Sequence, residues 1–579
     1  MKQQVGSVSH DTARFNPAAS SPGSSMMPPS CRTLVRCTEN CPLNLAGLGR
    51  IRLLGSRRND RETLRCWRVA VSSVLRRWEF SQVIVGFRVV GASVPGRLTH
   101  LLLALVTFPH VGIFPRRFAE FLVGSNHRFR AMPTHRRRQV KGNAMSYVFT
   151  HATLLDGTRD MQPQENMTVA VDDNGRISAV GPAASTVGPA GAQEVDLKGA
   201  YLMPGLVNLH VHLCGNGKPT SAGAAGDLIE KVVANPVGRW YLHRTLRKHA
   251  QQQLASGVTT VRSVGDPGFA DVWVRDAINA GKYQGPRLVT SGVGVTVPGG
   301  HGAGLFAHIA ETPDQAREIA RDCFAHKCDL VKLFITGGVF DAEKEGEPGV
   351  LRMSPEIAAA AVDEAHKLGM YTAAHIESTE GVRVGLEAGV DTIEHGGVLD
   401  DELLALFREN GVGRKSSLTC TVSPALPFIK LPPEMTHSTE VQVVNGRIVF
   451  DGIVSAAKQV LEQGIPVGLG TDSACPYVTQ YDMWRELVYF ERIVGASRQL
   501  ALHAATLGNA SIIGLGDETG SIEVGKSADM IVLDANPLDD LEALRNVRRV
   551  MVRGKFADGL HVKHLPELDR ELDKFLPRM

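Results

Sequence analysis

The stretch "GLVNLHVHL", residues 205–213, is an apolar run of strand length that carries two histidines one residue apart. A short apolar run that begins at a glycine and lacks charged residues is typical of a strand buried on both faces of a parallel sheet. Side chains two positions apart in a strand point to the same side, so His210 and His212 are expected to face one space. Two imidazoles in place of Val or Leu indicate a chemical role.

Seven further runs of this kind follow along the chain. They are "GVTTVRSVG" (257–265), "RLVTSGVGV" (287–295), "DLVKLFITGG" (329–338), "MYTAAHIES" (370–378), "VDTIEHGG" (390–397), "SLTCTVS" (417–423) and "IPVGLGTDS" (465–473). Amphipathic stretches such as "PDQAREIARDCFAHK" and "SPEIAAAAVDEAHKLG" separate them. Strands that alternate with helices build parallel sheets, and eight such units predict an α/β fold with a (β/α)8 TIM-type barrel over residues 205–516.

Short alternating strands flank the predicted barrel on both sides. Before it, "DDNG" at 172–175 joins two alternating stretches as a hairpin turn would. After it come "GSIEVGKSADMIVLD" (520–534) and "VRRVMVRGK" (547–555), which again have the pattern of short strands. The sequence therefore predicts a small β-sandwich domain built from residues 145–204 and 517–562, with a C-terminal tail at 563–579.

The first 144 residues have a different composition from the rest. They hold 21 Arg and 2 Lys against 6 acidic residues, a balance of +17, whereas the other 435 residues carry 40 basic and 54 acidic groups, a balance of −14. A large excess of arginine over lysine and a Ser/Pro-rich stretch at 18–30 are typical of translated GC-rich upstream sequence. We interpret 1–144 as a disordered or non-native leader, with the working protein starting near Met145. A basic targeting or membrane-surface arm is the alternative.

Chemically active side chains fall within or late in five of the eight runs, where a barrel of this type places its chemistry. They are His210, His212, Lys332, His375, His395 and Asp472. Neutral imidazole and carboxylate are the usual catalytic ligands of zinc. An ammonium group, with a pKa of about 10.4, is no ligand. Lys332 fits only as a carbamate formed with CO2, whose two oxygens would bridge two cations roughly 3.5 to 4 Å apart.

Each of these residues also has a structural explanation. A single strand histidine is commonly a hydrogen-bonded core residue, Asp472 would cap the next helix, and Lys332 would form an interior ion pair. The joint placement of all six near strand ends favours a centre of two divalent ions. Zinc is the expected metal, although the same ligands accept manganese, cobalt or iron.

Residues 145 to about 560 resemble the amidohydrolase superfamily. The motifs "MPGLVNLHVH", "VKLFITGGV", "AAHIES", "DTIEHGG" and "GLGTDS" are most similar to its prolidase-like and imidazolonepropionase-related branch. The resemblance implies a barrel with a two-part β domain and two metals. The more buried metal would be held by His210, His212 and Asp472, the other by His375 and His395, with carboxylated Lys332 as the bridge. Ser263, where relatives often have aspartate, and "GGHGAG" at 299–304 depart from the pattern.

The predicted reaction is hydrolysis by a metal-bridged hydroxide, with Asp472, His395 and His301 as catalytic residues. Two cations would lower the pKa of water from 15.7 toward about 7 while the ion held by His395 polarises the scissile carbonyl. Asp472 would take the proton and pass it to the leaving amine. His301, in a glycine-rich loop, would donate to the substrate carbonyl or contact a carboxylate. Glu394 faces away from His395 along its strand and is expected to play a supporting role.

The expected substrate is a small molecule with an amide or peptide-like C–N bond, such as a dipeptide or an N-acyl amino acid. An esterase, lactonase or phosphotriester hydrolase would use the same two-metal site, and a catalytically silent barrel scaffold is a third possibility. We expect a cytoplasmic protein that binds neither nucleic acid nor membrane. A homo-oligomer is possible, but no sequence feature fixes the number of subunits.

Overall fold

The computed structural model describes residues 145–219 and 225–576. The predicted leader, residues 1–144, lies outside the described residues. The domain boundaries proposed from the sequence stay predictions, although the predicted tail contains a helix, α17 (Pro566–Asp573).

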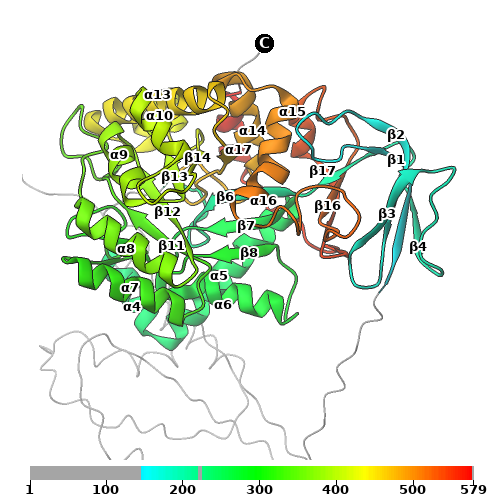
Figure 1. Cartoon of the computed structure of the whole chain (residues 1–579), viewed down its shortest axis with the longest axis horizontal. Helices are drawn as coiled ribbons and strands as arrows, with labels where there is room; N and C mark the ends of the chain where they lie inside the picture. The colour runs from blue at the N-terminus through cyan, green and yellow to red at the C-terminus, as the bar shows by residue number, and fades with distance from the viewer. Residues whose placement is uncertain (1–144, 220–224, 577–579) are drawn as a thin grey trace, which may run out of the picture. The chain divides into compact units, whose positions relative to one another are not determined.

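One sheet of eight strands is built from both ends of the described chain (Figure 1). Its strands are β1 (Tyr147–Leu154), β2 (Gln164–Val171), β3 (Ile177–Pro182), β4 (Gln193–Asp196), β5 (Tyr201–Pro204), β16 (Met530–Leu533), β17 (Val547–Val552) and β18 (Lys555–Phe556). The order is β18-β17-β16-β5-β1-β2-β3, and β4 pairs with β1. The predicted hairpin turn joins β2 to β3, where Gly175 has a φ of +76° and the Asp172 carboxylate accepts hydrogen bonds from the backbone N–H groups of Asn174 and Arg176.

The predicted β-sandwich is not confirmed, because these strands form a single sheet. β5 pairs antiparallel with β16, with Met203 opposite Ile531, so the two chain ends join edge to edge. Phe149, Val169 and Met530 belong to one buried apolar cluster on this sheet. The register shifts within β1 show bulges, which bend a strand and increase its twist.

Between the two halves of this sheet, the described chain forms ten further strands. They are β6 (Leu206–Val211), β7 (Val258–Ser263), β8 (Arg287–Thr290), β9 (Gly294–Thr296), β10 (Ala307–Ile309), β11 (Leu330–Phe334), β12 (Tyr371–Ile376), β13 (Thr392–His395), β14 (Ser417–Cys420) and β15 (Val467–Leu469). Each of the eight predicted runs contains a strand, and all the pairings among them are parallel.

The described strands do not pair as one closed ring, which differs from the predicted barrel. They form a seven-stranded sheet, β10-β9-β11-β12-β13-β14-β15, and a three-stranded sheet, β6-β7-β8. Single contacts join the two. The Asp472 N–H donates to the His210 carbonyl at 2.8 Å, Val211 bridges Ser473 in parallel, and the Asp329 N–H donates to the Thr290 carbonyl at 2.8 Å. The strands where the two sheets meet are short, since β15 has three residues and β8 has four. The two sheets are therefore not joined by a continuous ladder of backbone hydrogen bonds.

Helices connect and cover the parallel strands, as α8 and α9 cover β12. The helices are α4 (Ala225–Ala234), α5 (Pro236–Ala255), α6 (Ala270–Asn279), α7 (Pro313–Ala325), α8 (Pro355–Lys367), α9 (Thr379–Ala388), α10 (Asp401–Arg408), α11 (Leu426–Lys430), α12 (Pro433–Thr436), α13 (Glu440–Glu462), α14 (Met483–Tyr489), α15 (Arg498–His503), α16 (Asn509–Ile512) and α17. Short turns of other helical types are η2 (Pro267–Phe269), η3 (Phe490–Val494), η4 (Ala504–Gly508) and η5 (Leu541–Arg545). Helix α7, predicted from its periodicity, begins with a capping box of Thr312 and Gln315.

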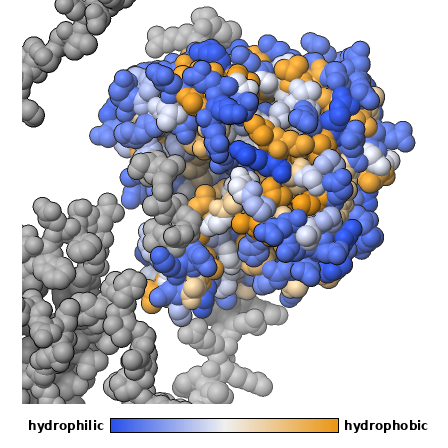
Figure 2. All heavy atoms as spheres, turned by 90° about the vertical axis from the view of Figure 1, so that its left-hand side faces the viewer, coloured by the Kyte–Doolittle hydropathy of each residue, from blue (hydrophilic) through white to orange (hydrophobic). Residues whose placement is uncertain are grey.

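Figure 2 shows one face of the molecule, on which apolar side chains gather in a band within a largely hydrophilic surface. Exposed apolar residues in the described chain include Val398, Val444 and Ile448. More than half of an ordinary protein surface is apolar, so such exposure indicates no function by itself. Within the described residues, no helix combines the length and the apolar character needed to cross a membrane.

Candidate metal centre

All six predicted ligands are buried and lie at the carboxyl ends of the parallel strands or between them. His210 is in β6 and His212 follows it directly, Lys332 is at the centre of β11, and His375 is in β12. His395 is the last residue of β13, and Asp472 comes shortly after β15. The ring centroid of His395 lies 4.8 Å from that of His210 and 4.7 Å from that of His375. Residues from five strands therefore meet in one place.

The first half of the cluster consists of His210, His212 and Asp472. The Oδ1 atom of Asp472 lies 3.6 Å from Nε2 of His210 and 3.5 Å from Nε2 of His212. The other ring nitrogens have fixed partners: Nδ1 of His210 lies 2.8 Å from Glu394 and Nδ1 of His212 lies 2.6 Å from the Gly265 carbonyl. These contacts orient both rings so that their Nε2 atoms face the same carboxylate oxygen, which is the arrangement of metal-binding histidines.

The second half consists of His375 and His395, together with Glu377, which sequence reasoning missed. Each of the three offers one possible ligand atom, and these atoms lie within 4.8 Å of one another. Nδ1 of His395 lies 2.7 Å from the Thr421 hydroxyl, while its Nε2 is buried without a hydrogen-bond partner. The Oε2 atom of Glu377 is likewise buried and unpartnered.

Lys332 lies close enough to both halves to influence their charges. Its Nζ is buried without a hydrogen-bond partner, so the predicted alternative of an interior ion pair is wrong. A buried ion pair does form between Arg262 and Glu394, with 2.7 Å between Nη2 of Arg262 and Oε1 of Glu394. Burial lowers the pKa of Lys332 to about 8, which increases the neutral fraction of the amine at neutral pH.

The four histidines predicted as ligands are held in the neutral form, which is the form that binds metals. Burial lowers the pKa of His212, lowers those of His210 and His375 well below the usual value, and lowers that of His395 to about 4. Burial alone would raise the pKa of Asp472, but the neighbouring histidines, His210 first, bring it below its usual value. The site thus offers neutral imidazole nitrogens and an ionised carboxylate, the ligand types of catalytic zinc.

Two ligands occupy unusual backbone conformations. His395 has a φ of +69° and Asp472 a φ of +56°, in the left-handed region that costs about 1 to 3 kcal/mol for a residue other than glycine. Gly470 is required nearby, because a Cβ atom there would lie 2.5 Å from Cβ of His210. Strained backbone of this kind is concentrated at functional sites.

His301, the third predicted catalytic residue, lies against the second half of the cluster. Its ring stacks on that of His375, with centroids 4.2 Å apart and an angle of 4° between the planes. Its Nδ1 bonds the Asp341 carboxylate. This contact fixes the ring and leaves Nε2 as the nitrogen available to a substrate.

Glycine at position 338 keeps a space open between these groups. A Cβ atom there would lie 3.2 Å from His301 Nδ1, 3.2 Å from His375 Nε2 and 3.3 Å from Glu377 Oε2. Together with the unpartnered His395 and Glu377 atoms, this space fits the binding of a cation at the second half of the cluster.

Several supporting residues were not predicted. Asp341, Thr421 and Glu377 contact site residues from loops or strand ends, where one sequence gives no signal for pairing. Asp266 accepts hydrogen bonds from the Ser263 hydroxyl at 2.7 Å and the Cys214 N–H at 2.8 Å. The serine that departs from the family pattern thus contacts a buried carboxylate three residues later.

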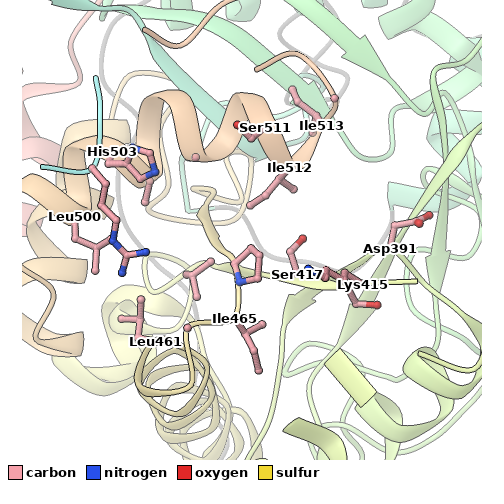
Figure 3. A pocket seen from close by; sticks show the side chains of 18 of the residues that line it. Asp391, Lys415, Ser417, Leu461, Ile465, Leu500, His503, Ser511, Ile512 and Ile513 are labelled. Carbon is pink, nitrogen blue, oxygen red and sulfur yellow. The ribbon is translucent and has the colours of Figure 1, made fainter. Parts of the chain in front are cut away.

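A separate cavity of about 640 Å³ lies at the opposite ends of the strands (Figure 3). Its lining includes Tyr371, Ser417 and Val467, the first residues of β12, β14 and β15. The ligands lie toward the other ends of these parallel strands. This cavity is therefore distinct from the candidate metal centre.

The comparisons with known proteins identify the family of the chain. The model of the amidohydrolase family matches residues 201–557. A solved structure of a putative prolidase from Bifidobacterium longum is 40% identical with a TM-score of 0.66, covering 74% of this chain and 99% of that one. A Xaa-Pro dipeptidase solved with methionine bound in its active site is 26% identical, with a TM-score of 0.62 and coverages of 71% and 99%. Imidazolonepropionase from Syntrophobacter fumaroxidans is 26% identical over 62% of this chain and 82% of its own length.

Proposed function

The chain belongs to the amidohydrolase family, in its prolidase- and imidazolonepropionase-like branch, and on that premise we propose that it hydrolyses the amide bond of a dipeptide or an N-acyl amino acid. It is a hydrolase that acts on carbon–nitrogen bonds. The observation that carries the substrate proposal is the meeting of His210, His212 and Asp472 with His375, His395 and Lys332. A putative prolidase and a Xaa-Pro dipeptidase among the similar structures support a small peptide as substrate.

We further propose that the parallel strands of the eight predicted runs form a closed (β/α)8 barrel. This proposal is supported by the order of the strands, by the single backbone contacts between the two sheets, and by the solved structures of similar proteins. A barrel would hold the six ligands at one rim, because the carboxyl ends of all its strands lie on the same side.

Two divalent cations, zinc in the first instance, fit the two halves of the cluster. His210, His212 and Asp472 would hold one, and His375 and His395 the other. When bound, such ions acidify a water molecule and polarise the substrate carbonyl. Lys332 would link the halves as a carbamate: its neutral amine adds to CO2, forming a C–N bond and releasing one proton, and the new anion has two oxygens.

The remaining steps are assigned to the chain's own groups. The Asp472 carboxylate takes the proton of the attacking water and delivers it to the nitrogen that leaves when the C–N bond breaks. Glu394 holds the ring of His210 with Nε2 toward Asp472. Asp341 fixes the ring of His301, which contacts the substrate through Nε2.

The test is a substrate panel on the metal-loaded protein, comparing dipeptides and N-acyl amino acids with aryl esters, lactones and phosphotriesters. Turnover of the first group, lost in Asp472→Asn, is the expected result. Turnover confined to esters or phosphotriesters would overturn the proposal. Absence of bound metal together with absence of turnover would favour a silent scaffold.

A further inference from the structure

Glu377 lies two positions after His375, at the end of β12. Side chains two apart in an extended segment point to the same side, so Glu377 and His375 face the same space. The backbone N–H of Glu377 donates to the Thr336 hydroxyl at 3.1 Å, which fixes the start of the loop after β12. The side chain is therefore directed into the site by the strand.

The carboxylate of Glu377 has no protein partner for one of its oxygens. Oε2 is buried without a hydrogen-bond partner, as is Nε2 of His395. A Cβ atom at Gly338 would lie 3.3 Å from Glu377 Oε2 and 3.2 Å from His375 Nε2, so the oxygen and the nitrogen border one space. A buried oxygen of this kind is costly unless a cation or a donor satisfies it.

We propose that Glu377 is the third protein ligand of the cation held by His375 and His395. This inference rests on the proposed two-metal function. Two imidazoles and one carboxylate form a ligand set that proteins use for catalytic zinc. The two imidazoles alone are neutral, and the carboxylate brings a negative charge to this half of the site, as Asp472 does to the other half. The second cation would then depend less on the Lys332 carbamate.

The experiment compares wild-type protein with Glu377→Gln, which keeps the size of the side chain and removes its charge. Metal-free protein is dialysed against graded free Zn²⁺, and bound zinc per chain is measured by mass spectrometry. We expect wild type to bind two ions. Glu377→Gln should bind the first normally and the second at least about tenfold more weakly. The absorption spectrum of the second equivalent of Co²⁺ should change as well.

Two further variants make the result decisive. Glu380→Gln removes an exposed carboxylate from the first turn of α9 and should bind both ions as wild type does. Glu377→Asp keeps the charge but shortens the side chain, and it should weaken the second ion by an intermediate factor. If thermal melting shows that metal-free Glu377→Gln is unfolded, Glu377→Asp replaces it in the zinc titration.

If Glu377→Gln binds both zinc ions as tightly as wild type does, the inference is overturned. If Glu377→Gln is unfolded, the same result for Glu377→Asp overturns it. A raised KM with unchanged metal binding would also overturn it and would indicate that Glu377 contacts the substrate. If wild-type protein binds no second ion, the two-metal function itself fails, which the wild-type titration alone reveals.

Discussion

The Nδ1 atom of His210 lies 2.8 Å from Oε2 of Glu394, whose Oε1 accepts a hydrogen bond of 2.7 Å from Arg262. All three side chains are buried. Arg262 also donates to the Leu209 carbonyl at 2.6 Å, so the chain of contacts returns to the strand that carries the first ligands. A buried ion pair thus sets the orientation of His210, a predicted metal ligand.

Glu394→Gln is expected to lower both stability and metal affinity. The substitution leaves the Arg262 charge uncompensated in the interior, which typically costs about 3 to 5 kcal/mol. Loss of the partner of His210 should weaken zinc binding about 10- to 100-fold. Urea unfolding of the metal-free protein and zinc dialysis measure the two effects. Unchanged values for both would contradict the assigned role, and Glu387→Gln on the exposed side of α9 is the matched control.

His301→Phe should lower kcat/KM about 100-fold without changing the number of bound metals. It keeps an aromatic ring against His375 but removes the polar contact of Nε2 with the substrate, and loss of one such contact to a reacting group has an effect of that order. Asp341→Asn should have a smaller effect, since it acts only by positioning His301. Steady-state kinetics with metal analysis measure both. A loss of bound metal in His301→Phe would show that the residue is a ligand instead.

Gly338→Ala should interfere with the second half of the site. The added methyl group would lie 3.2 Å from His375 Nε2 and 3.3 Å from Glu377 Oε2, closer than atoms normally pack. We expect the second zinc ion to bind roughly tenfold more weakly, as for other changes next to ligands. Gly337→Ala is the control, because its nearest neighbour would be at 3.6 Å. Equal zinc titrations for the two variants would be inconsistent with this geometry.

Titration of the four buried histidines of the cluster should contribute a loss of stability to the metal-free protein as the pH falls from about 6.5 toward 4, whereas buried carboxyls such as Glu486, whose pKa burial raises to about 7, act in the opposite direction. The histidines are neutral when folded, with the pKa of His395 lowered to about 4, but they bind protons near pH 6.5 when unfolded. The unfolded state therefore takes up more protons in this range. Each such histidine costs about 1.4 kcal/mol of stability per pH unit. Urea unfolding at several pH values tests this, and His395→Asn should reduce the slope.

Much of the fold follows from local sequence pattern. The run that contains β6 is apolar and bounded by a glycine, and α7 has both its period and its cap in the sequence. The single sheet was missed, because the pairing of β5 with β16 joins segments from opposite ends of the chain. The strands β9 and β10 have three residues each in a glycine-rich region, which is too short for a periodic signal.

The site was predictable where its residues are unusual for a buried strand. His210, His212 and Lys332 interrupt apolar runs, and this is what revealed them. Glu377 was missed because a charged residue directly after a strand normally indicates the start of an exposed loop. Asp341 was missed because its contact with His301 depends on how two loops meet.

The most direct test of the account is a crystal structure of the metal-loaded protein with anomalous diffraction recorded at the zinc edge. The account predicts two anomalous peaks, one against His210, His212 and Asp472 and the other against His375 and His395, with density beyond Nζ of Lys332 for a carboxyl group. No anomalous peak at these residues, with an unmodified Lys332 amine pointing away from them, would contradict it.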